Sequence, residues 1–350
     1  MEVKVRRFKS IYEAFLDLKR VNVMIGPPET GKSNLLEALS IFSLLGQIKN
    51  YINSGLVSPV SIGGGLWSLQ GLSEILRMMT RARKLDDIFF AFSREEPIEV
   101  ELDGKRMKCS YDSEKRALSV CLQEEEILEV DEYMNIRTRR EDLEGLPEDV
   151  KFYRYFEGKE VQKEVQFGDF LLPPHGPNLM YLLRTRDDLR RIATRILDDF
   201  NIKFIMSEGK IEFLKPRNGE HLRIEYHMLS DTVKRTLFCL GAVESNRDSL
   251  VMMEEPETRS FPFYTKFLAE RIALSDNSYI VTTHNPYFLE TLVEKIPEGD
   301  ISVYLSRASG WETKYERVDV RRIRGMVAEG VDVFFELGGE DEGLCGVLSD

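Results

Sequence analysis

The sequence predicts an α/β protein with a mainly parallel core sheet, joined by an antiparallel β subdomain and a helical subdomain. Apolar runs followed by helical patterns occupy residues 21–45 and recur at 250–294, which is typical of parallel β-α-β units. Between them, residues 97–130 form short segments of alternating apolar and polar residues. This alternation is typical of an antiparallel sheet.

The composition is that of a globular protein without a membrane segment. The chain has 350 residues and a net charge of −12, so a nucleic-acid contact would require a local basic patch. Four cysteines form no C-x-x-C pair, which argues against a zinc site and a disulfide framework. No segment reaches the roughly 18 apolar residues of a membrane span, and the N-terminus resembles a strand rather than a signal peptide. We therefore expect a cytoplasmic protein with no membrane contact.

The first half of the chain is predicted to contain strands at 3–8 and 21–25, with a helix after the second strand. Glycine and serine dominate residues 51–66, which are expected to be a loop, and a helix is expected at 75–85. Between IEVEL and MKCSY, Asp103-Gly104 predicts a two-residue hairpin turn.

The second half begins after a charged, irregular connection at 131–176. A helix of about 20 residues is expected next, followed by a hairpin from IKFIM to KIEFL and the strand LRIEY. Helices and strands then alternate, with helices at 230–243, 262–274 and 286–294 and strands at 250–253 and 279–283.

A glycine-rich segment, GPPETGKSN, follows the strand at 21–25 and precedes a helix. Residues Gly26 to Ser33 match G-x-x-x-x-G-K-[ST], the pattern of a phosphate-binding P-loop. Backbone N–H groups from Glu29 to Ser33 would then surround the β-phosphate, Lys32 would bridge the β- and γ-phosphates, and the Ser33 hydroxyl would bind Mg²⁺. The alternative is a tight strand-to-helix turn with an incidental lysine.

Two adjacent carboxylates, Glu254 and Glu255, follow the apolar run at 250–253. They lie at the carboxyl end of a predicted parallel strand, where ligands bind in open α/β sheets. Because neighbouring side chains of an extended chain point to opposite sides, one carboxylate can face a metal ion and the other the attacking water. A solvated turn is the alternative interpretation.

His284 follows the next apolar strand, within TTHNP. At this strand end it could donate a hydrogen bond to the γ-phosphate or orient the attacking water. A lone histidine at a strand end can also be purely structural, so the prediction depends on the two preceding motifs.

The segments GPPETGKSN, LSDTVKR, MMEEPE and TTHNP occur in this order and resemble the Walker A, signature, Walker B and switch-histidine motifs of ABC-type ATPases of the SMC, RecF and OLD-like branch. The opening segment, KVRRFKSIYEAFLDLKRVNVMIGPPETGKSNLLEAL, is similar to the first strands of that branch. The resemblance covers nearly the whole chain. It implies a P-loop NTPase of the ABC-ATPase head type, in which each ATP lies between the P-loop of one copy and the signature serine of a second copy.

The resemblance also assigns roles to individual residues. It implies that Glu255 is the general base, that His284 is the switch histidine, and that Ser33 and Glu254 bind Mg²⁺. Ser230 would contact the γ-phosphate of the partner's nucleotide. The implied nucleotide-binding set is Gly26, Glu29, Thr30, Gly31, Lys32, Ser33, Asn34 and Ser230.

The domain organisation implied is a single composite ABC-type ATPase domain over residues 1–350. Its expected parts are a P-loop core (1–49 with 245–310), an antiparallel sheet and insertion (50–176), a helical signature subdomain (177–244) and a C-terminal extension with an acidic tail (311–350).

Several features depart from the family pattern or have local explanations. Thr232 stands where the family usually has glycine, which would obstruct a close approach of the backbone to phosphate. Ser230 is also a good N-cap for the helix that follows it. Arg259 either faces the partner's nucleotide or lies on the surface, and Gln47 and Gln70 are candidates for the glutamine loop by location only.

The motifs together predict a Mg²⁺-dependent ATPase that forms a homodimer around ATP. The long separation of Ser33 and Glu254, the lack of heptads and the short segment after His284 favour a stand-alone head. DNA repair, chromosome maintenance or defence is the expected context, with DNA or a DNA-processing protein as partner. A nucleotide-gated scaffold with little turnover is the alternative.

The basic helix at 184–195 is interleaved with acidic residues, which favours a solvated face over a nucleic-acid patch.

Overall fold

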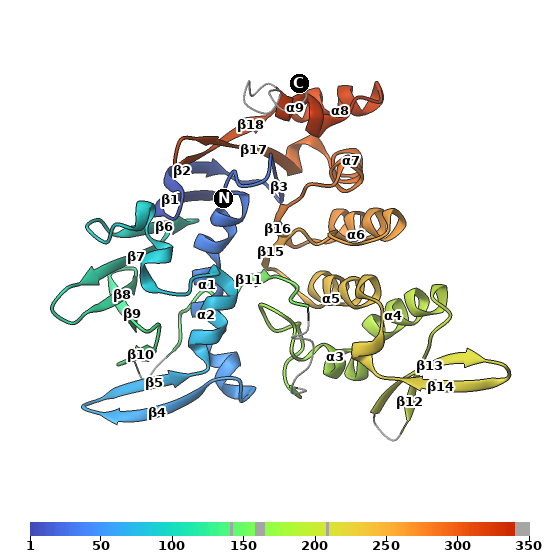
Figure 1. Cartoon of the computed structure of the whole chain (residues 1–350), viewed down its shortest axis with the longest axis horizontal. Coiled ribbons are helices and arrows are strands. Elements are labelled where there is room, and N and C mark those ends of the chain that lie inside the picture. Colours follow the sequence, from blue (N-terminus) through green and yellow to red (C-terminus); the bar gives the residue numbers. More distant parts are fainter. Residues whose placement is uncertain (141–142, 158–164, 208–209, 340–350) are drawn as a thin grey trace, which may run out of the picture.

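The computed structural model describes residues 1–140, 143–157, 165–207 and 210–339 (Figure 1). Cys345 and the part of the acidic tail from residue 340 onward lie outside the described residues. Within the described part of the chain, no helix is long and apolar enough to cross a membrane.

A six-stranded sheet carries the candidate site at the carboxyl ends of its parallel strands. Its order is β11 (Val150–Tyr153), β15 (Leu250–Glu254), β16 (Ser278–Thr282), β3 (Val21–Ile25), β17 (Ile301–Ser309) and β18 (Glu312–Val318). The first five strands run parallel, and β18 pairs with β17 in the antiparallel direction. All residues of β3 are buried, as expected for a strand that is covered on both faces.

Helices cover both faces of this sheet (Figure 1). Helix α1 (Lys32–Asn53) packs on one face, whereas α5 (Asp231–Ser245), α6 (Pro262–Leu274) and α7 (Pro286–Lys295) lie on the other. Alternate residues of β3 show the same division, because Met24 packs in the apolar cluster of α1 and Val23 in that of the other three helices.

A nine-stranded antiparallel sheet packs against the opposite side of α1. Its order is β2 (Ile11–Asp17), β1 (Glu2–Phe8), β6 (Ile98–Leu102), β7 (Lys105–Asp112), β8 (Ala117–Leu122), β9 (Glu125–Asp131), β10 (Ile136–Thr138), β5 (Leu66–Gln70) and β4 (Ser58–Gly63). Helix α1 therefore lies between two sheets, and its burial on nearly all sides follows from this position.

The remaining elements lie beside α1 and the nine-stranded sheet, on the helical side and at the C-terminal end of the molecule (Figure 1). They are α2 (Leu72–Thr80), α3 (Leu179–Thr185), α4 (Asp187–Asp199), α8 (Val320–Ala328) and α9 (Val333–Gly339), short 3₁₀ helices at Leu85–Ile88, Phe90–Phe92, Tyr226–Met228 and Glu298–Asp300, and a three-stranded sheet of β12 (Lys203–Ser207), β13 (Lys210–Arg217) and β14 (Glu220–Ile224). Helices α3 to α5 pack in the same apolar cluster as the helical face of the six-stranded sheet.

Several predicted elements are confirmed, and three need correction. The helix expected at 75–85 is α2, which begins at Leu72 and ends at Thr80, because Arg81 follows it in a left-handed conformation. The hairpin at Asp103-Gly104 is confirmed by the pairing of β6 with β7 around it. Residues 51–66 are not a loop, because α1 extends to Asn53 and β4 pairs with β5 through a turn of glycines with positive φ. The expected long helix is broken at Arg186, whose φ of −108° and ψ of 111° are those of an extended residue.

The predicted subdomain boundaries do not follow the sheets. Strands β1 and β2, which fall inside the 1–49 segment, belong to the antiparallel sheet, whereas β11, inside the 50–176 segment, joins the parallel strands. The chain thus crosses between the two sheets more often than the sequence pattern indicates.

Candidate functional site

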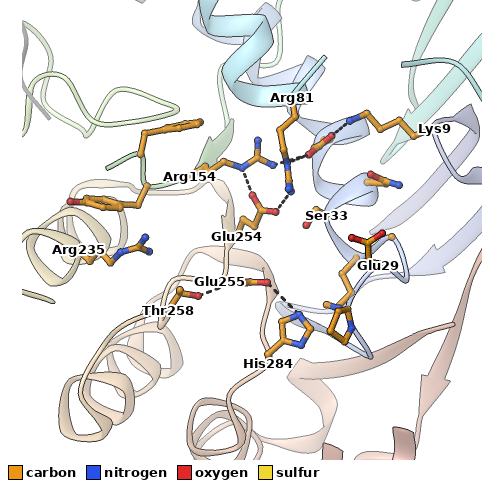
Figure 2. A pocket seen from close by; sticks show the side chains of 17 residues that line it. Lys9, Glu29, Ser33, Arg81, Arg154, Arg235, Glu254, Glu255, Thr258 and His284 are labelled. Atoms are coloured by element: carbon orange, nitrogen blue, oxygen red, sulfur yellow. Dashed lines mark hydrogen bonds and ion pairs between the residues drawn. The ribbon is translucent and has the colours of Figure 1, made fainter. Parts of the chain in front are cut away.

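A cavity of about 640 Å³ lies where the parallel strands β3, β11, β15 and β16 end (Figure 2). It brings together most of the residues singled out in the sequence. Those that line it are Glu29, Gly31, Lys32, Ser33, Asn34, Glu254, Glu255 and His284. Three separate motifs, distant in the sequence, therefore meet around one opening.

The loop between β3 and α1 is held in shape by its contacts with β17. A Cβ atom on Gly26, whose φ is +139°, would lie 2.5 Å from the carbonyl oxygen of Ser306. The Thr30 hydroxyl donates to the carbonyl of Pro27 (2.8 Å) and is hydrogen-bonded to the Ser306 hydroxyl (2.6 Å). Gly26 and Thr30 therefore shape the loop from behind rather than lining the cavity.

Lys32 points its ammonium group into the loop. Its Nζ donates to the carbonyl oxygens of Gly26 (2.9 Å) and Pro27 (2.6 Å). Burial lowers the pKa of Lys32 to about 8, although the nearby charge of Glu255 opposes this effect. A bound phosphate would supply the negative charge that this buried cation needs.

Asn34 is fixed at the start of α1. Its side-chain amide donates to the Ser10 hydroxyl (2.6 Å), which is in turn hydrogen-bonded to the Thr313 hydroxyl (2.6 Å). These two hydrogen bonds connect the first turn of α1 with both β18 and the β1–β2 turn. The role of Asn34 that these contacts support is positional.

Glu255 and His284 form a pair at the mouth of the cavity (Figure 2). The distance between His284 Nε2 and Glu255 Oε1 is 3.3 Å, and the Thr258 hydroxyl donates to Glu255 Oε2 at 3.1 Å. The hydrogen bond from His284 lowers the pKa of the Glu255 carboxyl below its ordinary value. An ionised, partly exposed carboxylate can accept a proton from a water molecule.

The two adjacent carboxylates do point in different directions, but not for the expected reason. Glu255 has a φ of +41°, so the chain leaves the strand in a left-handed conformation rather than continuing extended. Its backbone N–H donates to the carbonyl of Thr282 at 3.1 Å. Glu254, still in β15, faces a separate group of basic side chains.

That basic group was not predicted from the sequence. Lys9, Arg81 and Arg154 all donate to the buried carboxylate of Glu37 on α1, at 2.5, 2.6 and 2.9 Å. Both arginines also pair with Glu254 (Figure 2). Three cations and two carboxylates therefore form one connected network along a wall of the cavity.

The register of the strands explains how Arg154 reaches Glu254. Strands β11 and β15 are parallel, and Tyr153 pairs with Met253. Arg154 directly follows β11, and Glu254 is the last residue of β15, so the two side chains lie together at the carboxyl ends of these strands. No local sequence pattern indicates this contact, because β11 has only four residues inside a charged, irregular segment.

Glu257 links the segment MMEEPE, at the end of β15, to the segment TTHNP, which follows β16. It is 4% exposed and accepts hydrogen bonds from the Thr283 hydroxyl and from the His284 backbone N–H, the latter at 3.3 Å. Burial raises the pKa of Glu257 to about 7. The sequence motifs assigned no role to Glu257.

The signature residue Ser230 lies outside this cavity. Its side chain accepts a hydrogen bond from the backbone N–H of Val233 (3.4 Å), so the predicted N-cap of α5 is confirmed. The Thr232 hydroxyl donates to the carbonyl of Arg259 at 3.1 Å. Arg259 is 61% exposed and pairs with Glu157 at 2.7 Å, which agrees with the surface interpretation.

Two further sequence candidates are not part of the cavity wall. Gln47 is buried in α1 and donates to the carbonyl of Glu148, and Gln70 is exposed at the end of β5. On the basic helix, Arg186 pairs with Asp188 and Arg190 pairs with Asp187. These ion pairs favour the solvated-face interpretation of that helix.

No protein-family model and no curated protein sequence matches this chain. Solved structures do match. An SMC head bound to the C-winged helix domain of ScpA is 13% identical, with a TM-score of 0.55 over 93% of this chain and 98% of that one. An SMC head from Pyrococcus furiosus, with an extended coiled coil and bound to the C-terminal domain of ScpA, is 12% identical, with a TM-score of 0.53 over 94% and 98%.

The chain has the fold of SMC head domains. The resemblance inferred from the four motifs is therefore confirmed at the level of the fold. The SMC head domain from Thermotoga maritima also matches, with 13% identity and a TM-score of 0.44 over 91% of this chain and 98% of that one.

The oxygen donors that line the cavity fit a magnesium ion bound beside a nucleotide. Among the described residues, no group of three or more His, Cys, Asp or Glu side chains could hold a metal by itself. Mg²⁺ beside a nucleotide, however, usually needs only one or two protein oxygens and takes its other ligands from phosphate and water. Ser33 and Glu254 both line the cavity and can supply those oxygens.

Proposed function

We propose that the chain is an ATPase head that binds Mg-ATP in this cavity and hydrolyses its β–γ bond. The observation that carries the proposal is the convergence of a P-loop, with its buried Lys32, and a Glu255–His284 pair on one cavity. A P-loop alone would fit many nucleotide-binding proteins. The ionised Glu255 on the opposite side of the opening adds a group suited to activate water.

The residue roles follow from this arrangement. The backbone N–H groups of the loop and the start of α1 bind the β-phosphate, and Lys32 exchanges its carbonyl partners for phosphate oxygens. Ser33 and Glu254 would hold Mg²⁺, which would neutralise the phosphate charge. Glu255 accepts the proton of the attacking water, and His284 orients Glu255 and contacts the γ-phosphate.

We further propose that the complete site forms between two copies of the chain. Ser230 is exposed and does not line the cavity of its own copy, so it is available to a second nucleotide. The chain would then act as one composite domain that closes on a second copy around ATP. Its parts are the P-loop core, the antiparallel part, the helical signature part and the C-terminal extension. Chromosome maintenance, repair or defence is the context we propose, with DNA or a DNA-processing protein as partner.

Phosphate release from purified protein tests the enzymatic proposal. We expect Mg-dependent turnover in the wild type, loss of ATP binding in Lys32→Ala, and retained ATP binding without turnover in Glu255→Gln. Lys49→Ala, an exposed lysine on the same helix, and Glu114→Gln, on an exposed turn, are the matched controls. Full turnover of Glu255→Gln would disprove the base assignment, and unchanged ATP binding by Lys32→Ala would disprove the phosphate cradle.

A nucleotide-gated scaffold is a second candidate. Thr232 in the signature favours it, because its side chain occupies the position where a glycine would let the backbone approach phosphate. In that case ATP would bind and change the oligomeric state while phosphate release stayed near the background rate. The same assay, combined with an ATP-binding measurement, separates the two functions.

A further inference from the structure

The carboxylate of Glu254 is already occupied by two arginines. Arg81 pairs with Oε1 through Nη2, and Arg154 pairs with Oε2 through Nε. Charge-assisted hydrogen bonds of this kind are among the strong ones in proteins. A metal ion that uses Glu254 as a ligand therefore has to compete with at least one guanidinium group.

The two arginines are not equally free to leave. The side chain of Arg154 is 8% exposed, and its Nη1 donates to the carbonyl oxygens of Met78 (2.7 Å) and Met79 (3.1 Å). The side chain of Arg81 is 51% exposed. Arg154 is therefore anchored on several sides, whereas the Nη2 group of Arg81 can leave Glu254 while its Nε keeps the hydrogen bond to Glu37 (2.6 Å).

The backbone supports the same distinction. Arg81 follows the last residue of α2 in a left-handed conformation, with φ of 54° and ψ of 9°. It belongs to a connection between α2 and a short 3₁₀ helix rather than to a sheet edge. Such a position lets the side chain move without disturbing a strand or a helix interior.

The charges around Glu254 also favour displacement. Lys9, Arg81 and Arg154 carry three positive charges, and Glu37 and Glu254 carry two negative ones, which leaves a net charge of +1 before any metal arrives. A divalent cation brought next to Glu254 would be repelled by a guanidinium on the same carboxylate. Moving Arg81 away reduces this repulsion, although Arg154 remains, and frees a lone pair on Oε1.

We propose that Arg81 holds Glu254 while the metal site is empty and leaves it when Mg²⁺ binds, so that Arg81 sets the metal affinity of the site. Arg154 stays in place and keeps Glu254 oriented. This inference rests on the proposed function, because it takes Glu254 as a metal ligand beside a bound nucleotide. It adds a residue, Arg81, to which neither a motif nor the sequence pattern assigns a role.

Metal binding, rather than turnover, provides the direct test. Mn²⁺ would replace Mg²⁺ as the probe, with free Mn²⁺ measured by electron paramagnetic resonance in the presence of a saturating, non-hydrolysable ATP analogue. We expect Arg81→Gln to bind Mn²⁺ about tenfold more tightly than the wild type, because a competing charge-assisted hydrogen bond is lost. Arg81→Lys keeps the charge but not the fork of donors, so an intermediate affinity is expected.

Arg77→Gln is the matched control, since Arg77 lies one turn earlier on α2, is exposed and donates to the carbonyl of Tyr133. Its Mn²⁺ affinity should equal that of the wild type. In a Glu254→Gln background, Arg81→Gln should give no gain, because the carboxylate for which the two cations compete is absent.

Equal Mn²⁺ affinity of the wild type and Arg81→Gln, or a gain that persists in the Glu254→Gln background, would overturn the role of Arg81. Analogue binding without metal is measured first for every variant, and circular dichroism confirms that each is folded. A wild type that binds neither analogue nor Mn²⁺ would instead reject the proposed function itself, together with this inference. If Arg81→Gln does not fold, the Arg81→Lys comparison still decides the question.

Discussion

Glu257 is a carboxyl group kept inside the protein by two hydrogen bonds. Its Oε1 accepts from Thr283 and from the backbone of His284, while its Oε2 has no hydrogen-bond partner among the described residues. A buried carboxylate with an unsatisfied oxygen favours its neutral form, which is why burial raises its pKa to about 7. Its ionisation state therefore affects stability near neutral pH.

Glu257→Gln is predicted to change how stability depends on pH. Between about pH 4.5 and about pH 7 the folded wild type retains a proton that the unfolded chain has lost, so its free energy of unfolding falls as pH rises and stays lower above pH 7. The glutamine side chain does not titrate, so it makes no such pH-dependent contribution to the free energy of unfolding. Relative to the wild type, the glutamine variant should gain up to about 3 kcal/mol between pH 4.5 and pH 8.

Guanidinium denaturation at pH 4.5, 6 and 8 measures this difference. The exposed Glu114→Gln variant, which should track the wild type at each pH, is the control. A stability difference between Glu257→Gln and the wild type that stays constant across this range would contradict the raised pKa.

The positions of the candidate site residues were predictable from the sequence only where a short motif contains them. The positions of Lys32, Ser33, Glu255 and His284 follow from local patterns, and the structure places all four at one cavity. The contacts of Glu37 with Arg81 and Arg154 depend on side chains 44 and 117 positions apart. No local pattern specifies which distant cation fills such a position, so this network required the structure.

At the scale of elements, long apolar strands were predictable and short or exposed ones were not. Strands β3, β15 and β16 are buried apolar runs, and their pattern alone identifies them. Strand β4 is exposed at every residue, so its pairing with β5 rather than its hydrophobicity makes it a strand. Strand β11 consists of four buried residues that include Lys151, and its pairing with β15 determines its conformation.

The start of α1 depends on a strand that lies far away in the sequence. Gly31 has a φ of +81°, and a Cβ atom there would lie 2.1 Å from the Thr313 hydroxyl of β18 and 2.8 Å from the Ser10 hydroxyl. The carbonyl of Gly31 also accepts a hydrogen bond from the Tyr315 hydroxyl at 2.8 Å. The P-loop is therefore packed directly against β18 as well as β17.

Gly31→Ala is predicted to disturb the loop through both backbone strain and collision. Gly310→Ala is the matched control, because Gly310 also has a positive φ, +60°, but has open space around its Cβ position. We expect Gly310→Ala to lower the free energy of unfolding by about 1 kcal/mol. Gly31→Ala should lower it by about 2–4 kcal/mol and weaken ATP binding.

Denaturant titration and calorimetry with ATP compare the two glycine variants. Equal losses of stability, with ATP affinity retained in both, would mean that β18 does not restrict the P-loop. A larger loss in Gly31→Ala together with weaker ATP binding would instead connect the C-terminal strands to the nucleotide site.

At the scale of the whole molecule, the fold class was predictable but the connection between its two sheets was not. The cavity wall combines residues from the α1–α2 side, such as Arg81, with residues from the strand ends of the other side, such as Glu254 (Figure 2). Ser230 lies at the start of α5 and does not contribute to this wall. One copy of the chain thus presents a cavity and, separately, an exposed signature serine.

The last prediction concerns the second copy. If the signature serine binds the partner's nucleotide, Glu255→Gln should change from monomer to dimer only when Mg-ATP is present, as measured by light scattering. Adding Ser230→Asp to this variant should abolish the dimer, because a carboxylate repels the triphosphate. The helix should remain intact, since Asp is as good an N-cap as Ser. Ser113→Asp, on an exposed turn, controls for the added charge.

These variants separate two explanations for a failure to dimerise. If Glu255→Gln binds ATP and stays monomeric, Thr232 beside Ser230 has removed the contact in trans, and a different partner must complete the site. If it forms a dimer that Ser230→Asp does not weaken, the two copies meet through another surface. A dimer that depends on ATP and is lost only with Ser230→Asp would require the signature serine to face the nucleotide of the other copy, because the monomer keeps that serine outside its own cavity.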